Sequence, residues 1–123
     1  MSTALVWVAV AVAGAVGALA RTMVTTRIAR RVGIALPWGT IAVNGSGCLA
    51  LGVFVGAGIG GDAARIVDTA LIGAYTTFSA WLYESDRLGA RGRQGWAVAN
   101  VVGSVALGIV LLVGGRALGR QIA

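Results

Sequence analysis

Four long apolar runs, separated by short segments that carry arginine, dominate this sequence of 123 residues. The first run, residues 4–20, contains only apolar side chains and glycine. As an α-helix it would rise about 26 Å. The hydrocarbon core of a bilayer is about 30 Å thick, and Arg21 can extend the span by reaching the interface. Because only helices and closed barrels satisfy the backbone in lipid, these runs predict transmembrane helices.

Composition leads to the same fold class. The chain is 58% hydrophobic and 11% charged, whereas soluble domains carry about 25% charged residues. So short a chain cannot bury this much apolar surface in a core of its own. We therefore predict an all-α integral membrane protein, a single domain over residues 1–123, with helices over about 4–27, 37–58, 64–84 and 95–116. A signal peptide is the competing interpretation of the first run, but no basic region precedes it and equally apolar runs follow.

The charged and reactive side chains exclude several functions. All ten basic residues are arginine, against four acids, and they cluster between apolar runs as in membrane loops. Nucleic-acid-binding modules keep a soluble face, so no nucleic acid is expected as a partner. The absence of histidine and the single cysteine, Cys48, exclude Cys/His metal sites and internal disulfides. No nucleophile–base pair is evident, so we do not expect an enzyme.

The second run shows how its helix begins and packs. Pro37 suits a first helical turn, and Trp38 suits the membrane interface. Glycines at positions 45, 47, 52, 56 and 60 include small residues four apart. Such spacing lets helices approach closely in lipid. We interpret only residues 58–61 as a loop.

Polar side chains within the apolar runs are few. Residues 73–84 read GAYTTFSAWLYE, and Asn44 and Ser104 lie in neighbouring runs. Taken singly, each polar group is explained by a hydrogen bond between helices. Asn44 and Ser104 together are harder to explain in this way, because both are donors that could approach one anion.

The order of residues within this stretch allows two interpretations. On an unbroken helix, Thr77, Trp81 and Glu84 would share one face, with Phe78 one turn before Trp81. An aromatic pair at this spacing is ordinarily core packing, although ring edges can also attract an anion. The Thr76–Thr77 step is compatible with a helix break whose freed carbonyls bind a small cation.

Three segments carry a resemblance to a known family. GALAR (17–21), PWGTIAVNGSG (37–47) and GAYTTFSAWLYE (73–84) together resemble the Fluc (CrcB) family of fluoride ion channels. The resemblance implies a fluoride-specific channel that lets fluoride leave the cell passively and so protects against its toxicity. It also implies a multi-pass protein of the bacterial cell membrane, with a broken third helix, that forms an antiparallel dual-topology dimer.

The resemblance further implies roles for individual residues. Backbone carbonyls of Gly73 and Thr76 would bind a structural sodium ion (Na+), and Arg21 would face an aqueous vestibule. The positions that match the fluoride pore are Asn44, Thr77, Phe78, Trp81, Glu84 and Ser104. The partner implied is a homodimer mate or a homologous subunit in a heterodimer, surrounded by membrane lipid.

The sequence departs from the family pattern at three positions. The family commonly reads TTFSTF where this chain reads TTFSAW, so that Ala80 replaces a threonine and Trp81 a phenylalanine. Asn100 stands where an aromatic residue is usual. The sodium positions are therefore better supported than the second half of the pore lining.

Two other functions are weighed against the channel. A small multidrug-resistance-type dual-topology transporter would need a carboxylate deep in the membrane. The first run has none, and Glu84 lies near a helix end. A structural membrane subunit is the second alternative, and normal fluoride tolerance after deletion of the gene would favour it.

Overall fold

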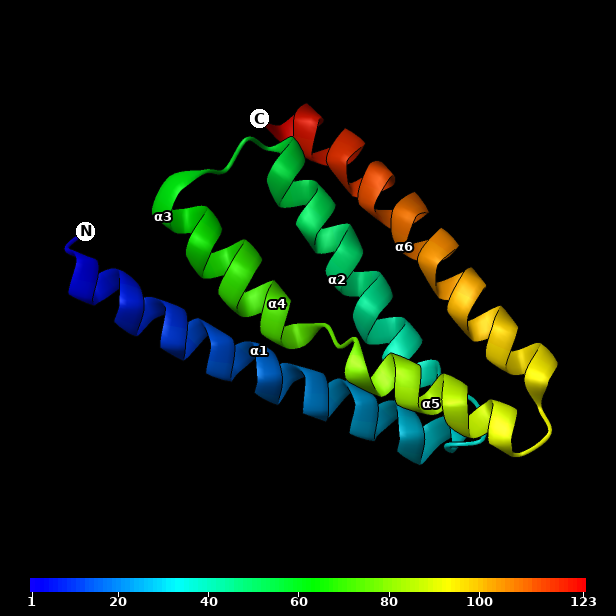
Figure 1. Cartoon of the computed structure of the whole chain (residues 1–123). Helices are drawn as coiled ribbons and strands as arrows, with labels where there is room; N and C mark the ends of the chain where they lie inside the picture. The colour runs from blue at the N-terminus through cyan, green and yellow to red at the C-terminus, as the bar shows by residue number, and fades with distance from the viewer.

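The computed structural model describes every residue of the chain and contains helices only. The elements are α1 (Thr3–Val32), α2 (Trp38–Gly56), α3 (Gly61–Ala64), η1 (Arg65–Ile72), α4 (Gly73–Tyr75), α5 (Ser79–Ala90) and α6 (Gln94–Ile122). The elements α3 to α5 form one interrupted segment, so the chain makes four helical segments that run back and forth (Figure 1). The all-α prediction is confirmed.

Two helices run further than expected. The predicted end of the first helix was residue 27, but α1 continues through Arg30 and Arg31 to Val32. Its stop is Gly33, at φ 78°, a conformation that glycine adopts without a steric penalty. The last helix was expected to end near residue 116 and continues to Ile122. Arginines mark the edge of the bilayer, but they are good helix formers and do not end a helix.

The chain has almost no core of its own. Three helices, α1, α2 and α6, are each long and apolar enough to cross a membrane. Only 14 of the 123 residues are buried, and large apolar side chains point outward along the helices. Trp38 and Trp96, near the starts of α2 and α6, are about half exposed, as expected for tryptophan at an interface. The protein is thus a multi-pass membrane protein whose surrounding solvent is lipid.

Glycines bring α2 and α6 into backbone contact along their length. A Cβ atom added to Gly52 or Gly56 would meet the carbonyl oxygen of Leu112 or Arg116 on α6. In return, Gly115 and Gly119 of α6 pack on the backbone of α2. The prediction that small residues four apart in the second run permit close packing is confirmed for Gly52 and Gly56. The two helices lie side by side in Figure 1.

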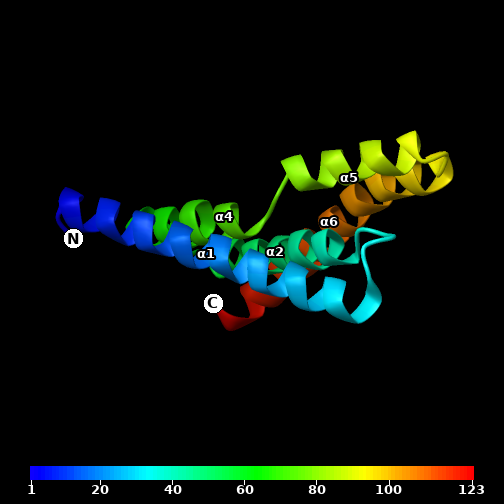
Figure 2. The same ribbon diagram turned by 90° about the horizontal axis from the view of Figure 1, so that it is seen from below.

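The third segment is broken midway. Thr76 has extended backbone angles (φ −79°, ψ 161°), and helical structure resumes only at Ser79. Figure 2 shows α5 displaced sideways from the line of α4. Thr77 therefore lies in the break, and the expectation that Thr77, Trp81 and Glu84 share one helical face is wrong. Before the break, η1 is a π-helix, a local form that occurs often near functional sites.

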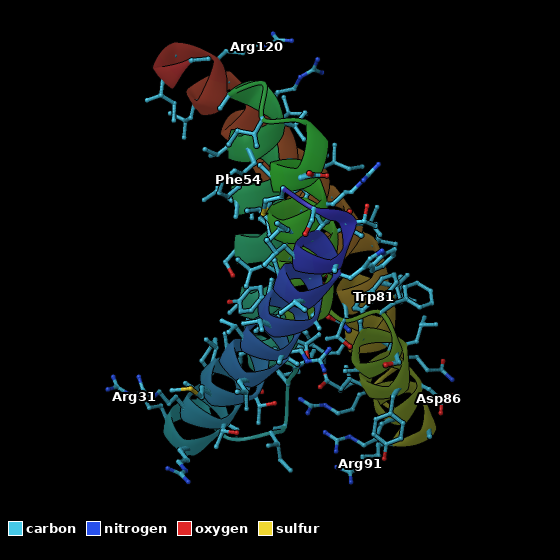
Figure 3. The ribbon with its side chains drawn as sticks, turned by 90° about the vertical axis from the view of Figure 1, so that its left-hand side faces the viewer. Arg31, Phe54, Trp81, Asp86, Arg91 and Arg120 are labelled. Carbon is cyan, nitrogen blue, oxygen red and sulfur yellow. The ribbon has the colours of Figure 1, made fainter.

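Arginines gather at the two ends of the bundle. Figure 3 shows Arg31 and Arg91 at one end and Arg120 at the other. At the first end, Arg87 Nη2 donates to the Ile34 carbonyl at 3.0 Å. This contact places the α1–α2 connection and the end of α5 at the same end of the bundle.

Candidate functional site

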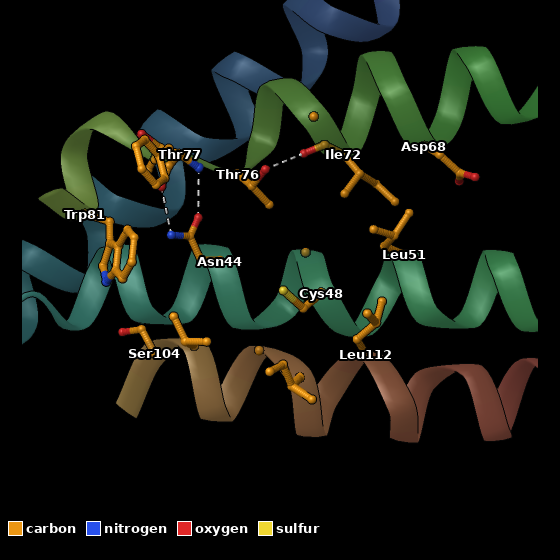
Figure 4. Close-up of a pocket in the computed structure, with 16 residues that line it drawn as sticks. Asn44, Cys48, Leu51, Asp68, Ile72, Thr76, Thr77, Trp81, Ser104 and Leu112 are labelled. Atoms are coloured by element: carbon orange, nitrogen blue, oxygen red, sulfur yellow. Dashed lines mark hydrogen bonds between the residues drawn. The ribbon is translucent and has the colours of Figure 1, made fainter. Parts of the chain in front are cut away.

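An open cavity of about 450 Å³ lies where the break in the third segment faces α2 and α6 (Figure 4). Seven of the positions matched to the family's sites line it: Asn44, Gly73, Thr76, Thr77, Phe78, Trp81 and Ser104. Arg21 and Glu84 do not line this cavity. The cavity therefore brings together most of the polar groups that the sequence places at membrane depth.

Asn44 satisfies both backbone groups of Thr77, the residue in the break. Its Nδ2 donates to the Thr77 carbonyl at 2.9 Å, and its Oδ1 accepts the Thr77 N–H at 2.8 Å. Backbone groups freed by a helix break are costly in lipid unless they find partners. One N–H of the Asn44 amide remains, because an amide nitrogen carries two hydrogens and only one is used here.

Two more donors at the break remain unpaired. Thr77 Oγ1 accepts the Ala80 N–H at 3.3 Å, a capping bond for the first turn of α5, so its hydroxyl hydrogen is free. The Phe78 N–H makes no hydrogen bond. Together with the remaining N–H of Asn44, these groups are neutral donors at the start of α5, where the helix dipole favours an anion.

Aromatic rings form the next part of the lining. The centroids of Phe78 and Trp81 lie 5.5 Å apart, and the planes are tilted by 57°. This is ordinary aromatic packing. Phe78 is nonetheless 68% exposed, so its ring edge is not buried within the subunit.

Trp81 and Ser104 are held by Asn100. Trp81 Nε1 donates to the backbone carbonyl of Asn100 at 3.2 Å. Ser104 Oγ donates to the side-chain Oδ1 of Asn100, also at 3.2 Å. In the sequence, Trp81 and Asn100 are separate departures from the pattern of the family that the chain resembles. They are in contact, a pairing that one sequence without an alignment does not reveal.

The carbonyls of Gly73 and Thr76 differ in their surroundings. None of the N–H groups of the break donates to the Gly73 carbonyl, which leaves it open. The Thr76 carbonyl accepts Arg21 Nη1 at 3.3 Å. Arg21 therefore reaches from α1 to the break, where it brings a positive charge.

Glu84 lies in a separate hollow of about 310 Å³, which also borders Thr25 and Arg87. Its Oε1 accepts the Thr40 hydroxyl at 2.9 Å, whereas its Oε2 is buried and has no partner. The resemblance implies that Glu84 and Thr77 both belong to the fluoride pore. Within this subunit they line different hollows.

Asp68 is a carboxylate that the sequence analysis overlooked. It lies on η1, lines the cavity, and has a buried Oδ1 with no hydrogen-bond partner. Besides Glu84, the third apolar run thus contains a second carboxylate, which bears on the transporter alternative. The signal was available, since Asp68 falls inside the third apolar run, two helical turns after Gly61.

Comparison with known proteins identifies the family. The model described as "CrcB-like protein, Camphor Resistance (CrcB)" matches residues 8–116. A "Fluoride-specific ion channel FluC 2" of Mycolicibacterium paratuberculosis is 45% identical over 108 residues, 88% of each chain. The protein of the same name in Mycobacterium tuberculosis is 39% identical over 114 residues, 93% of this chain and 90% of the relative. A "Fluoride-specific ion channel FluC" of Acidobacterium capsulatum is 42% identical over 118 residues, 92% of this chain and 94% of the relative. With this coverage and a lining that unites the matched residues, the chain belongs to the CrcB-like family.

Proposed function

We propose that this chain is a subunit of a fluoride-selective channel through which fluoride leaves the cell passively. The observation that carries the proposal is the set of unpaired neutral donors at the helix break: the second N–H of Asn44, the Thr77 hydroxyl and the Phe78 N–H. Relatives at 39–45% identity bear the name fluoride-specific ion channel, which supports the same substrate.

The chemistry of the lining suits fluoride. A small, strongly hydrated anion enters a pore only if donors replace its water. Neutral donors do this without binding the ion so tightly that it cannot leave. The edge of the exposed Phe78 ring adds positive electrostatic potential without adding a polar group that would have to be desolvated in lipid.

Fluoride efflux from liposomes tests the function directly. Purified protein should carry fluoride at least a hundred times faster than chloride, a selectivity on the order of 3 kcal/mol. Chloride transport as fast as fluoride transport would exclude a selective channel. In cells, deletion of the gene should raise sensitivity to fluoride, whereas unchanged sensitivity would favour a purely structural subunit.

A second subunit completes the pore in this proposal. The cavity is open, and Phe78 on its edge is 68% exposed. An antiparallel, dual-topology partner would cover this face, either as a second copy or as a homologous chain. Relatives carry the numbered names FluC 1 and FluC 2, which agrees with paired homologous subunits.

A structural sodium ion is part of the proposal. The open Gly73 carbonyl is a suitable hard ligand, and the Thr76 carbonyl has a second lone pair beside its bond to Arg21. Carbonyls of two subunits would together hold the ion. When bound, sodium would supply a fixed positive charge near the path of the anion.

Asp68 supports a proton-coupled exporter as the second candidate. A carboxylate at membrane depth without a partner is what such coupling requires. The two candidates differ in one measurement. A passive channel equilibrates fluoride with its own gradient, whereas a coupled exporter drives fluoride against that gradient when a pH gradient is imposed. Family membership favours the channel.

A further inference from the structure

A closed chain of hydrogen bonds joins α5 to α6 beside the cavity. Asn100 Nδ2 donates to Ser85 Oγ at 2.8 Å, and Asn100 Oδ1 accepts the Ser104 hydroxyl at 3.2 Å. Ser85 Oγ donates in turn to the Trp81 backbone carbonyl at 2.9 Å. Trp81 Nε1 closes the chain by donating to the Asn100 backbone carbonyl at 3.2 Å. Asn100 and Ser85 are each 6% exposed, so water does not replace these partners.

We propose that Asn100 is a positioning residue whose side chain withdraws the Ser104 hydroxyl hydrogen from the cavity and, through Ser85, supports the turn of α5 that carries Trp81. A serine hydroxyl has one hydrogen to donate. While Asn100 Oδ1 holds it, Ser104 presents lone pairs to the cavity, and these repel an anion. The indole N–H of Trp81 is also committed, but to the backbone carbonyl of Asn100 and not to its side chain.

The arrangement resists rearrangement by a passing anion. If Ser104 turned its hydrogen toward fluoride, Asn100 Oδ1 would remain buried without a donor, which costs more than an average hydrogen bond contributes. Hydrogen bonds in such a chain also strengthen one another. Ser104 therefore remains an acceptor toward the cavity.

The consequence is an asymmetric cavity. The wall formed by α5 and α6 offers no side-chain donor, and the donors proposed for fluoride lie at the break, on Asn44, Thr77 and Phe78. Trp81 and Asn100, the two departures from the family pattern, thus belong to one hydrogen-bonded group. This inference rests on the proposed fluoride pathway and assigns its donors to one end.

Transport by a set of variants tests the role of Ser104. We expect Ser104→Ala to change fluoride efflux by less than about twofold in the otherwise unchanged protein. In an Asn100→Leu background the hydroxyl is released, and the same Ser104→Ala change should lower efflux roughly three- to tenfold, the worth of one hydrogen bond. Asn100→Ala gives the same expectation if Asn100→Leu does not fold.

Ser85→Ala is the matched control. It removes a buried partner of Asn100 but keeps the bond from Ser104 to Asn100. Ser104→Ala should therefore stay within about twofold in this background too. If Ser104→Ala lowered efflux equally with Asn100 present and absent, the hydroxyl would be available to fluoride and the proposal would be wrong.

The indole ¹⁵N–¹H resonance of Trp81 provides a readout that does not depend on transport. In detergent micelles it is assigned by its loss in Trp81→Phe. Leucine keeps the backbone carbonyl that accepts the indole N–H, so Asn100→Leu acts on Trp81 only through the lost bond to Ser85. We expect Asn100→Leu and Ser85→Ala to shift the resonance, and Ser104→Ala to leave it in place. An unmoved resonance in Asn100→Leu would overturn the positioning role. A moved resonance in a protein that carries no fluoride would support that role and reject the proposed function.

Discussion

The side chain of Asn44 on α2 closes two hydrogen bonds with the backbone of Thr77, at 2.9 Å and 2.8 Å, and so serves as the missing helical partner of a broken segment. A residue that looks like a free donor in the sequence is also a structural support. The structural role is compatible with the anion-binding role proposed for Asn44, because one amide hydrogen bonds the break and the other remains.

Because Asn44 supports the break and is also a proposed donor to fluoride, Asn44→Asp should affect both stability and transport. The change removes the donor to the Thr77 carbonyl and adds a charge that repels fluoride. We expect fluoride efflux to fall on the order of a hundredfold or more. Because the Thr77 carbonyl loses its partner, the free energy of unfolding should fall by about 1–3 kcal/mol. Liposome efflux and thermal unfolding in detergent measure the two effects.

Ser46→Ala is the matched control on the same helix, because Ser46 bonds the Tyr75 hydroxyl at an exposed site. It should leave efflux unchanged. Undiminished fluoride efflux from Asn44→Asp would remove Asn44 from the pathway.

Asp68→Asn should raise fluoride efflux. The substitution keeps the shape of the side chain and removes an unpaired negative charge from the lining of the cavity. We expect roughly a two- to tenfold increase, from a repulsion of about 1 kcal/mol. Asp86→Asn, at an exposed end of the bundle, is the control. If Asp68→Asn instead abolished uphill fluoride movement driven by a pH gradient, the proton-coupled candidate would replace the channel.

Gly73→Val tests the proposed sodium site and the subunit interface. Within the subunit, an added Cβ at Gly73 meets only the Asp68 carbonyl oxygen, at 3.9 Å, so the fold itself should tolerate it. A loss of dimer on size exclusion would then report on contacts outside the subunit. Replacement of sodium by N-methylglucamine should weaken the unsubstituted dimer in the same way. A dimer that is equally stable and active without sodium would contradict the site.

Gly56→Ala should destabilise the pairing of α2 and α6. The new methyl group meets the backbone of Arg116, which cannot move aside as a side chain would. We expect a loss of about 1–3 kcal/mol in the free energy of unfolding, as for overpacked cores. Gly60→Ala is the control, because nothing lies within 4 Å of a Cβ at that position. Equal melting temperatures for the two variants would exclude backbone contact as the basis of the packing.

Sequence patterns predict the architecture well, because helices in lipid follow from local composition. The apolar runs indicate the spans, and the glycine spacing indicates a closely packed second helix, whereas its partner, α6, is known only from the structure. Helix ends were less predictable: Gly33 ends α1, but only the structure shows that Arg30 and Arg31 precede that end as helical residues.

The partners at the site could not be predicted from single residues. Asn44 bonds a backbone 33 positions away, and Trp81 bonds one 19 positions away. Periodicity assumes a continuous helix, so it failed at Thr77, where the break shifts every later side chain. Asp68 was missed because a single acid within an apolar run has little effect on hydropathy.

The last prediction concerns orientation in the membrane. One end of the bundle, formed by the last turns of α1 and α5 and the connection to α6, carries Arg27, Arg30, Arg31, Arg87, Arg91 and Arg93, and the other end carries Arg65, Arg116 and Arg120. Contacts from Arg87 and Arg93 to the carbonyls of Ile34 and Ala35 agree with this grouping. Because loop arginines favour the cytoplasm, we expect a preferred orientation with both termini outside, and an oppositely biased homologue as the partner.

Single-cysteine labelling measures the orientation. In a Cys48→Ala background, a cysteine at Gln121 should react in intact cells with a maleimide that cannot cross the membrane. A cysteine at Gly92, in the connection between α5 and α6, should react only after lysis. Coexpression with the homologous chain should then give a heterodimer that carries fluoride faster than this chain alone. Equal labelling of both positions in intact cells, with full fluoride transport by this chain alone, would instead establish a homodimer that inserts in both orientations.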